Sequence, residues 1–382
     1  MINQIEIQNF KCFQTSTKFE FSKLNLLTGI NGRGKSTLLQ AILILSQSAW
    51  KNVNFKNLVI NGELLQLGNF DDIKNSETLK GDNIKFSLNI DSPLISDIVI
   101  QFEGNPDKPL IADFVKADLV SRGRKIEIDP KKKKTDDLIQ TFSSIIKRIH
   151  FVSADRLGPV KYVDKINIPE FLNVGPRGEF TINIIAEYLN LDNANDKLCI
   201  GIDANHILQQ TQEWLNYILE GGKVKIEGQD KSSSVLTMLL NNRNNSYNYK
   251  PINIGFGYSY ILPLIVTGLI AKPGDIIIIE NPEAHLHPRA QARISEFFAK
   301  VASCDIQVFI ESHSEHILNG LRIGALNPEI DIKHNDLVIY YFNENFNPEK
   351  LAMDSKGKIA NWPNGFFDQQ EIDLSNIFKL SK

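Results

Sequence analysis

Apolar and polar residues alternate along the first part of the chain, as they do in strands that bury one face. The alternation is loose over residues 2–7 and 18–21, which predicts edge or antiparallel strands. Residues 83–102 contain two alternating runs, KFSLNI and DIVIQF, separated by DSP, a pattern typical of a hairpin or meander. We therefore expect antiparallel β-structure in the N-terminal part.

Other short runs are mostly or wholly apolar, which is typical of parallel strands that are buried on both faces. They are residues 24–28, 149–152, 276–280 and 306–310. Longer segments predict helices: residues 35–48, a largely helical stretch over 182–214, about 258–270, and 288–303. Residues 241–248 hold five Asn and predict a loop or β-turn. Buried strands interleaved with helices predict an α/β fold.

Composition excludes several classes of protein. The 382 residues are enough for two or three structural units, and 42% hydrophobic with 23% charged residues excludes a disordered or collagen-like chain. The net charge of −3 means that any contact with nucleic acid must come from a local basic patch. Three distant cysteines predict no disulfide framework or zinc site. With no signal-peptide layout and no membrane-length apolar run, we expect a cytoplasmic protein.

Residues 29–36, GINGRGKS, fit the phosphate-loop pattern G-x-x-x-x-G-K-[ST]. The motif follows an apolar run and opens a predicted helix, a context that disfavours a chance glycine-rich turn. Glycines let successive backbone N–H groups approach phosphates. Lys35 is placed to reach the β- and γ-phosphates, Ser36 to ligate Mg²⁺, and Thr37 to make a further phosphate contact. The motif predicts that the chain binds a nucleoside triphosphate.

A second acidic site is expected at the end of a neighbouring buried strand, because a phosphate loop needs a carboxylate to hold Mg²⁺. The run DIIIIE ends in Glu280 and is followed by NPEAHLHP. Farther along, the run VFIESHS delivers His313 to the same predicted sheet edge. Since Lys35 and Glu280 lie far apart in sequence, the fold must close from both ends of the chain.

The order of these motifs resembles that of ABC-type ATPases of the SMC, RecF and OLD group, in particular the small stand-alone members of the kind found in bacterial antiphage defence. In chain order, the motifs that carry the resemblance are Asn9-Phe10-Lys11, the phosphate loop, Asn253 to Ser259 (the signature), Glu280 to Pro288 and Ser312-His313-Ser314. Residues 362–368, WPNGFFD, are similar to a tail of uncharacterised function in one subfamily. The middle of the chain matches only weakly.

The resemblance implies an α/β fold in the form of an ABC-type ATPase head. This fold has a mixed sheet around the phosphate loop, an N-terminal antiparallel β part and an inserted, largely helical lobe. The expected units are residues 1–70 with the phosphate loop, 71–250 as an inserted β-meander and helical lobe, 251–345 as the C-terminal part of the head, and 346–382 as a tail.

The resemblance also implies ATP and Mg²⁺ as cofactors and a homodimer, with each ATP between the phosphate loop of one copy and the signature of the other. The implied nucleotide contacts are Lys11, Asn31, Gly32, Arg33, Gly34, Lys35, Ser36 and Thr37, joined by Gly255, Gly257 and Ser259 from the second copy. Ser36 and Glu280 are the implied metal ligands. For Gly255 and Gly257 taken alone, a simple loop remains the alternative.

Two departures from the family pattern affect catalysis. Glu280 replaces the Walker B aspartate, and Asn281 replaces the glutamate that activates water in relatives. An amide cannot accept a proton, so Asn281 at most orients the water. Glu283 is then either the base or a structural residue, and His313 either contacts the γ-phosphate or is a satisfied strand-end histidine. We expect slow hydrolysis, with ATP acting largely as a dimerisation switch.

Two further motif positions are less specific. The family's Q-loop glutamine is missing after residues 149–153, which leaves Asp155, Arg156, Gln47 or Gln66 as substitutes. The pair His285 and His287 has no third ligand nearby in the sequence, so an ordinary loop is favoured over a metal site.

Residues 121–134 hold seven Lys or Arg and only two acidic residues. The segment from Arg122 to Lys134 either contacts DNA or RNA phosphates or is a solvated loop.

Two functions remain for the whole chain. The first is an ATP-dependent switch and scaffold that controls a separately encoded effector, a nuclease. The second is an autonomous DNA-maintenance ATPase like RecF or SMC. The near-neutral charge and the absence of coiled-coil arms favour the switch. We expect the chain itself to cut no nucleic acid.

Overall fold

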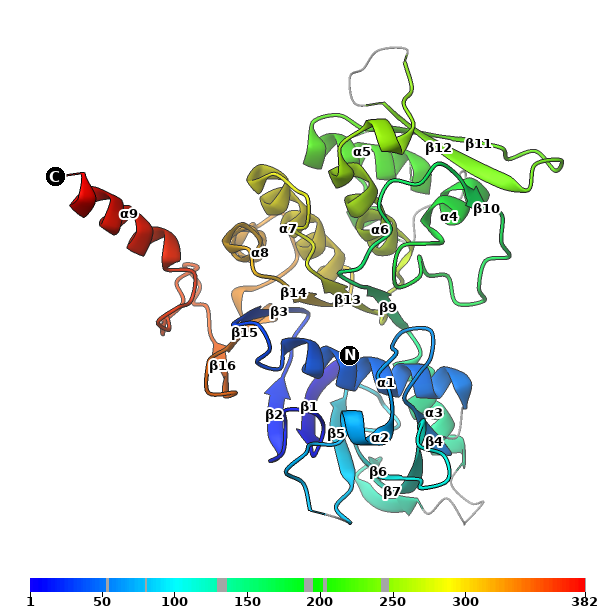
Figure 1. Ribbon diagram of the computed structural model, residues 1–382, viewed down its shortest axis with the longest axis vertical. Helices are drawn as coiled ribbons and strands as arrows, with labels where there is room; N and C mark the ends of the chain where they lie inside the picture. The colour runs from blue at the N-terminus through cyan, green and yellow to red at the C-terminus, as the bar shows by residue number, and fades with distance from the viewer. Residues whose placement is uncertain are drawn as a thin grey trace.

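The computed structural model describes residues 1–52, 55–79, 81–128, 136–188, 195–201, 205–241 and 247–381. A central sheet lies between two layers, an antiparallel β layer with α1 on one face and a cluster of helices on the other (Figure 1). The C-terminal helix projects away from these layers.

The central sheet holds the phosphate-loop strand at its middle. Its strands, in spatial order, are β16 (Pro348–Leu351), β15 (Leu337–Phe342), β3 (Leu24–Gly29), β14 (Gln307–Glu311), β13 (Ile276–Glu280) and β9 (Ile149–Val152). All neighbours pair in parallel except β16 with β15. The predicted buried strands are therefore confirmed, and they meet in one sheet although they come from both ends of the chain.

The isoleucines of β13 explain why this strand lies inside the sheet. Ile276 and Ile278 pack into the hydrophobic core shared with α1 and the antiparallel layer. Ile277 and Ile279 pack into the core under the helices. Because both faces of β13 are covered, an unbroken apolar run is the sequence pattern that fits.

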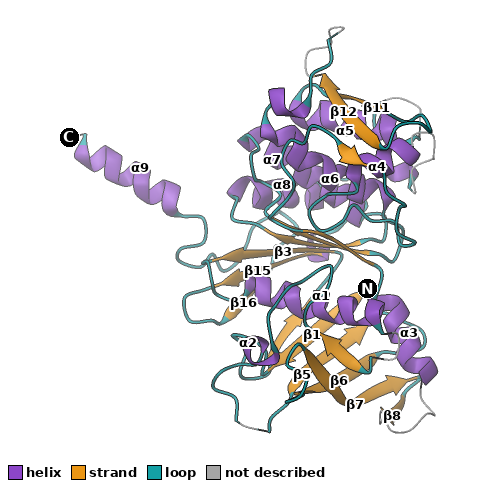
Figure 2. Cartoon of the chain, turned by 45° about the vertical axis from the view of Figure 1, so that its right-hand side comes forward, coloured by secondary structure: helices purple, strands orange, loops and turns teal. Residues whose placement is uncertain are grey.

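The antiparallel layer is built mainly from the alternating N-terminal segments. Its strands are β2 (Thr17–Glu20), β1 (Ile2–Gln8), β5 (Ile84–Ile90), β6 (Asp97–Gly104), β7 (Ile111–Ser121) and β4 (Asn57–Val59), with β8 (Arg124–Ile128) paired to β7. The helices on this side are α1 (Lys35–Lys51), α2 (Phe70–Ile73) and α3 (Asp136–Ile146). The predicted antiparallel strands and meander are confirmed. Figure 2 shows α1 between this layer and the central sheet.

The opposite layer is mostly helical. Its α-helices are α4 (Thr181–Glu187), α5 (Ile207–Leu219), α6 (Phe256–Ile270), α7 (Pro288–Ala302) and α8 (Glu315–Leu326). It also contains a small sheet in the order β10 (Val163–Asp164), β12 (Val235–Asn241), β11 (Lys223–Glu227). The short 3₁₀ helices are η2 (Asp196–Leu198), η3 (Pro251–Asn253) and η4 (His334–Asp336). The α/β class with a mixed central sheet, an antiparallel β part and a largely helical lobe is confirmed.

The prediction of one largely helical stretch over 182–214 was too simple. Among the described residues, α4 and α5 are separate helices with the short η2 between them. Cys199 is extended after η2, and Gly201 has a φ of +76°. A residue in the left-handed region cannot continue a right-handed helix, so the chain turns before α5.

The proposed division into units stays a prediction, and strand pairing links its parts. The segment 71–250 contributes β5, which pairs with β1, and β9, which pairs with β13. The loop expected over 241–248 lies partly outside the described residues, since residues 242–246 are not described.

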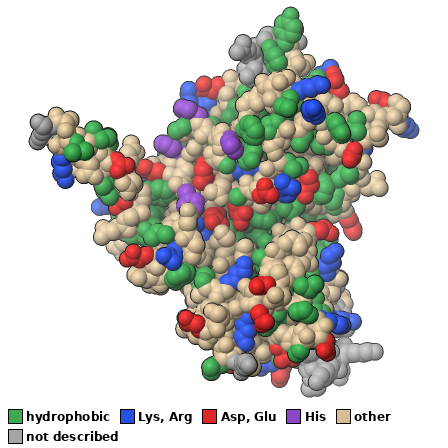
Figure 3. All heavy atoms as spheres, in the orientation of Figure 1, with side chains coloured by type: hydrophobic (Ala, Val, Ile, Leu, Met, Phe, Trp, Pro, Cys, Tyr) green, Lys and Arg blue, Asp and Glu red, His purple; other side chains and the backbone are tan. Residues whose placement is uncertain are grey.

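The tail leads from β16 to α9 (Gln369–Leu380), which projects from the body in Figure 1. No residue of α9 is buried. Hydrophobic side chains lie on its surface in Figure 3, and Ile377 and Phe378 are both more than 60% exposed. Within the described part of the chain, no helix is both long and apolar enough to cross a membrane.

Candidate nucleotide-binding site

The phosphate loop joins β3 to α1 in the predicted strand–loop–helix arrangement. The Lys35 ammonium lies inside the loop, where it donates to the carbonyls of Gly29 (3.0 Å) and Ile30 (2.8 Å). Only 3% of Lys35 is exposed, and burial lowers the pKa of its amino group. The loop thus holds a buried cation at the N-terminus of a helix, an arrangement suited to binding an anion.

Two loop glycines are required by close packing. A Cβ at Gly29 would lie 2.4 Å from the carbonyl oxygen of Phe342 on β15. A Cβ at Gly34, where φ is +106°, would lie 3.0 Å from Cys12 Sγ. The loop backbone therefore requires glycine at these two positions.

Lys11 reaches toward the same end of α1. Both Asn9 and Lys11 have positive φ values, of 60° and 49°, so the chain turns sharply here. Lys11 Nζ donates to Gln40 Oε1 at 2.6 Å, and burial lowers the pKa of this lysine. The basic residue of the Asn9-Phe10-Lys11 motif therefore lies beside the first turns of the phosphate-loop helix.

The carboxylate of Glu311, at the end of β14, is hydrogen-bonded to the hydroxyl of Ser36. Glu311 Oε1 and Oε2 each accept from Ser36 Oγ at 3.1 Å. Glu311 is 6% exposed, and burial together with the charge of Glu280 raises the pKa of its carboxyl to about 7, while Lys35 opposes the shift. The sequence did not single out Glu311, because it reads as the end of a buried strand.

Glu280 stands beside Glu311 in the register of β13 and β14. Its Oε2 accepts from the backbone N–H of Ala154 at 3.1 Å. Burial raises the pKa of Glu280. The two adjacent strands thus bring two carboxylates to the sheet edge next to the phosphate loop.

Arg156 holds the backbone at the end of β13. It is 2% exposed and donates to the carbonyls of Glu280 (2.8 Å) and Asn281 (2.6 Å). Burial lowers the pKa of Arg156 to about 10. Asn281 has a φ of 46° and donates its N–H to the Glu311 carbonyl at 2.8 Å. These contacts fix the turn that follows the acidic strand.

Glu283 is bound to the segment that carries His313. Its Oε2 accepts from Ser312 Oγ at 2.8 Å, and its Oε1 accepts from the His313 N–H at 2.9 Å. The His313 residue is exposed, and partial burial of the imidazole together with the charge of Lys35 lowers its pKa. Glu283 therefore links the loop after β13 to the loop after β14.

A cavity of about 370 Å³ opens against the first half of the phosphate loop. Its walls are Thr28 to Asn31, His313 and Tyr341, together with residues 365–369 of the tail. The tail is anchored by Phe366, which is 1% exposed and meets the Tyr341 ring edge-on at 5.4 Å. The phosphate loop, the histidine loop and the C-terminal tail thus share one cavity.

Residues 24–319 match the family model described as "AAA domain, putative AbiEii toxin, Type IV TA system". The chain belongs to this AAA family. C-terminal to this AAA domain, residues 332–377 match a second model, "Protein of unknown function (DUF3696)". No curated protein matches the sequence.

Solved structures similar to this AAA-family chain include SMC heads at low identity. An SMC head domain from Thermotoga maritima is 11% identical, with a TM-score of 0.43 and coverage of 92% of this chain and 99% of that one. An Smc head with an extended coiled coil, bound to the C-terminal domain of ScpA from Pyrococcus furiosus, is 12% identical, with a TM-score of 0.49 and coverage of 100% and 99%.

The signature segment of this AAA domain lies at the N-terminus of α6. Gly255 and Phe256 are exposed, whereas Ser259 is only 9% exposed. Gly257 packs closely on the loop after β13, since a Cβ there would lie 3.0 Å from the His285 carbonyl oxygen. None of these residues lines the cavity at the phosphate loop of the same chain.

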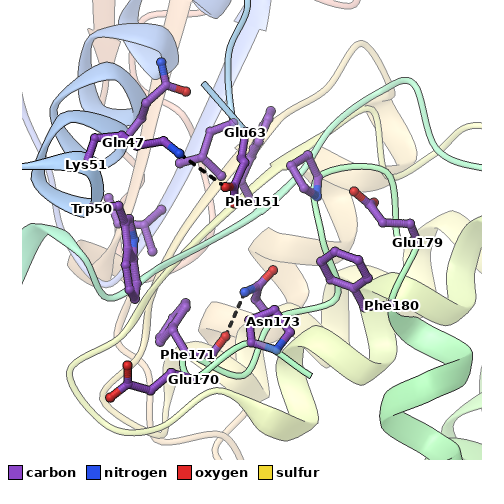
Figure 4. Close-up of a pocket in the computed structure, with 14 residues that line it drawn as sticks. Gln47, Trp50, Lys51, Glu63, Phe151, Glu170, Phe171, Asn173, Glu179 and Phe180 are labelled. Carbon is purple, nitrogen blue, oxygen red and sulfur yellow. Dashed lines mark hydrogen bonds and ion pairs between the residues drawn. The ribbon is translucent and has the colours of Figure 1, made fainter. Parts of the chain in front are cut away.

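The two glutamines considered for the Q-loop are held elsewhere. Gln47 donates to the Val59 carbonyl (2.7 Å) and accepts from the Leu65 N–H (2.9 Å). It lines a separate cavity of about 390 Å³ near the C-terminal end of α1, with Trp50 and Phe171 (Figure 4). Gln66 is tied to the Gly62 carbonyl within its own loop.

The two histidines considered as metal ligands and the basic segment are not brought together at the phosphate loop. His287 caps α7, and His285 packs on Tyr260 with ring centroids 4.5 Å apart. The described residues contain no group of three metal-ligating His, Cys, Asp or Glu side chains. Arg122 and Arg124 are exposed on the β7–β8 hairpin, whereas the tetralysine 131–134 lies outside the described residues.

Proposed function

We propose that this AAA-family domain binds ATP with Mg²⁺ at the phosphate loop. The observation that carries the proposal is the Lys35 ammonium enclosed by the Gly29 and Ile30 carbonyls at the start of α1. Backbone N–H groups of the loop and Lys35 would bind the phosphates. The nucleotide contacts in this proposal are Lys11, Asn31, Gly32, Arg33, Gly34, Lys35, Ser36 and Thr37.

The residues at this loop fit Mg²⁺. Ser36 offers a hydroxyl, and the neighbouring strand ends offer the carboxylates of Glu280 and Glu311. Hydroxyl and carboxylate oxygens are hard ligands of the kind that Mg²⁺ takes. When bound, the ion would neutralise charge on the phosphate oxygens.

The second element of the proposal is a homodimer around ATP. Gly255 and Phe256 open α6 at an exposed surface that is not part of their own phosphate-loop cavity. A second copy, related by two-fold symmetry, would bring Gly255, Gly257 and the start of α6 to the ATP bound by the first copy. The burial of Ser259 makes it a support of this surface in the proposal, with the glycines in direct contact.

Hydrolysis in this proposal is slow. Asn281 cannot accept a proton, and its backbone is held by Arg156 and Glu311. Glu283 is the carboxylate that would take a proton from the attacking water, and doing so would require it to release Ser312 or the His313 N–H. His313, exposed in the cavity wall, would contact the terminal phosphate.

The slow ATPase then serves as a switch that controls a separately encoded effector, a nuclease, in antiphage defence within the cytoplasm. The family description, which names a putative AbiEii toxin of a Type IV TA system, supports an unlike partner protein. ATP-dependent closure of two heads would change the surface that the partner meets. The effector acts on nucleic acid, and the switch controls when it does.

The test combines ATP turnover with oligomer mass from light scattering, with and without duplex DNA. Wild type should form an ATP-dependent dimer with slow turnover that DNA leaves unchanged. Lys35→Ala should lose both properties, and Glu283→Gln should dimerise but turn over more slowly. Lys51→Ala, at the far end of α1, is the matched control and should behave as wild type. DNA-stimulated turnover would replace the switch with a DNA-maintenance ATPase.

A further inference from the structure

We infer that Glu311, rather than Glu280, is the carboxylate that joins Ser36 in holding Mg²⁺. This inference rests on the proposed ATP and Mg²⁺ site and assigns a residue that the motifs do not mark. It concerns one side chain at the end of β14 and one hydroxyl in the first turn of α1.

The two carboxylates differ in their hydrogen-bond partners. Both Glu311 oxygens lie 3.1 Å from Ser36 Oγ, whereas the Glu280 carboxylate accepts from the Ala154 N–H on the other side. Strand order gives the reason. β14 is the direct neighbour of β3, and β13 lies one strand farther away, an added separation of about 4.8 Å.

The spacing of the Ser36–Glu311 pair suits a shared ion. Mg²⁺ demands near-octahedral geometry with oxygens at about 2.0–2.1 Å, so two adjacent ligands lie about 2.9 Å apart. The observed 3.1 Å is close to this value. The ion therefore needs only a small displacement of these two oxygens, with the hydroxyl proton turned away from the carboxylate.

The backbone around Glu311 fixes its direction. Glu311 pairs with Leu27 of β3 and Glu280 of β13, so it lies between two parallel neighbours. Its carbonyl accepts the Asn281 N–H at 2.8 Å. A carboxylate on such a rigid element is held in place for a ligand better than one on a mobile loop.

The deciding experiment uses electron paramagnetic resonance to measure Mn²⁺ binding to the full chain in the presence of a non-hydrolysable ATP analogue. Glu311→Gln should weaken Mn²⁺ binding about 10-fold or more, since loss of one partner in a metal site costs on this scale. Glu280→Gln should weaken it clearly less than Glu311→Gln does, because the Glu280 carboxylate is bound to the Ala154 N–H and not to Ser36. Glu315→Gln, four residues along the chain on α8, is the matched control and should bind Mn²⁺ as wild type does.

A double-mutant cycle with Ser36→Ala separates a shared ion from mere packing. If both side chains hold the ion, the loss in Ser36→Ala/Glu311→Gln should be smaller than the product of the two single losses. Glu311→Asp keeps the charge on a shorter arm and should fall between wild type and Glu311→Gln. Thermal unfolding of each variant without nucleotide checks that the fold is intact.

The results that would contradict the Glu311 assignment differ from those that would contradict the proposed ATP site. Wild-type Mn²⁺ affinity in folded Glu311→Gln or Glu311→Asp, with a large loss in Glu280→Gln, would overturn the inference and leave the proposed ATP site standing. A wild-type chain that binds neither the non-hydrolysable ATP analogue nor Mn²⁺ would overturn both the inference and the proposed ATP site. Nucleotide affinity measured in EDTA reports the phosphate loop alone, and Glu311→Gln should leave it no weaker.

Discussion

Single residues in this chain are tightly constrained where β3 becomes the phosphate loop. Gly29 has a φ of +120° and leaves no room for a Cβ against the Phe342 carbonyl. Gly123 on the β7–β8 turn also has a positive φ, of +76°, but a Cβ there would meet nothing within 4 Å. The two positions therefore separate steric clash from backbone strain.

We predict that Gly29→Ala lowers the free energy of unfolding by about 3 kcal/mol or more, because clash adds to left-handed strain. Gly123→Ala should cost about 1 kcal/mol from strain alone. Urea denaturation measures both, and fluorescent ATP-analogue binding should be lost only in the first variant. Equal costs at the two positions would show that the loop relaxes around a methyl group.

A second residue-scale prediction concerns Asp275, which precedes β13. Its Oδ1 lies 2.7 Å from Arg148 Nε, and its Oδ2 lies 3.1 Å from His150 Nε2. Burial alone would raise its pKa, but the hydrogen bonds from His150 and the Lys272 N–H and the charge of Arg148 outweigh burial and hold the pKa of Asp275 below its ordinary value.

A carboxyl group with a lowered pKa contributes stability above its unfolded pKa, near 3.9, and loses that contribution as the pH falls through the folded pKa. Asp275→Asn should therefore lower the free energy of unfolding by about 2 kcal/mol at pH 7. The difference from wild type should shrink below about pH 4. Urea denaturation at pH 7 and at low pH tests this, and a difference that stays constant with pH would contradict it.

At the same scale, motif residues could be predicted and Glu311 could not. Spacing alone marks Lys35 and Ser36, because the phosphate loop is local in sequence. Glu311 gains its meaning from the order of strands, which places β14 beside β3. Arg156 is similar, since its partners are two carbonyls at the end of β13.

Among the helices and strands, those with a clear pattern of apolar and polar residues could be predicted, and those without such a pattern could not. The buried strands β9 and β13 were predicted with their observed bounds. β15 and β16 were not predicted, although β15 is buried along its whole length. The tail was recognised only as a motif. Its place follows from long-range packing of Phe366 on Tyr341, which no local pattern reports.

An element-scale prediction concerns α9, which buries no side chain. A chain that ends at Asp368 should keep the wild-type free energy of unfolding within about 0.5 kcal/mol, because exposed positions contribute little. Phe366→Ala, just before this helix, is the contrasting variant and should cost about 3 kcal/mol from its buried ring. A large loss on removing α9 would mean that this helix packs against the body in solution.

At the scale of the whole molecule, the phosphate-loop cavity and the signature segment lie at different places on one chain. The phosphate-loop cavity is lined by both ends of the chain, whereas the exposed start of α6 lies outside it. The closing of both chain ends around the central sheet could be predicted from the distance between Lys35 and Glu280 in sequence. The separation of α6 from the cavity required the arrangement of helices above the sheet.

This separation leads to a prediction about assembly. Phe256 is 53% exposed at the N-terminus of α6, between the two signature glycines. Phe256→Asp would place a carboxylate next to the triphosphate of the second copy, where like charges repel. It should abolish the ATP-dependent dimer in light scattering while leaving ATP-analogue binding by the monomer within about 2-fold of wild type. Leu110→Asp, 58% exposed and before β7, is the control and should still dimerise. A Phe256→Asp chain that dimerises normally with ATP would exclude the start of α6 from the dimer interface.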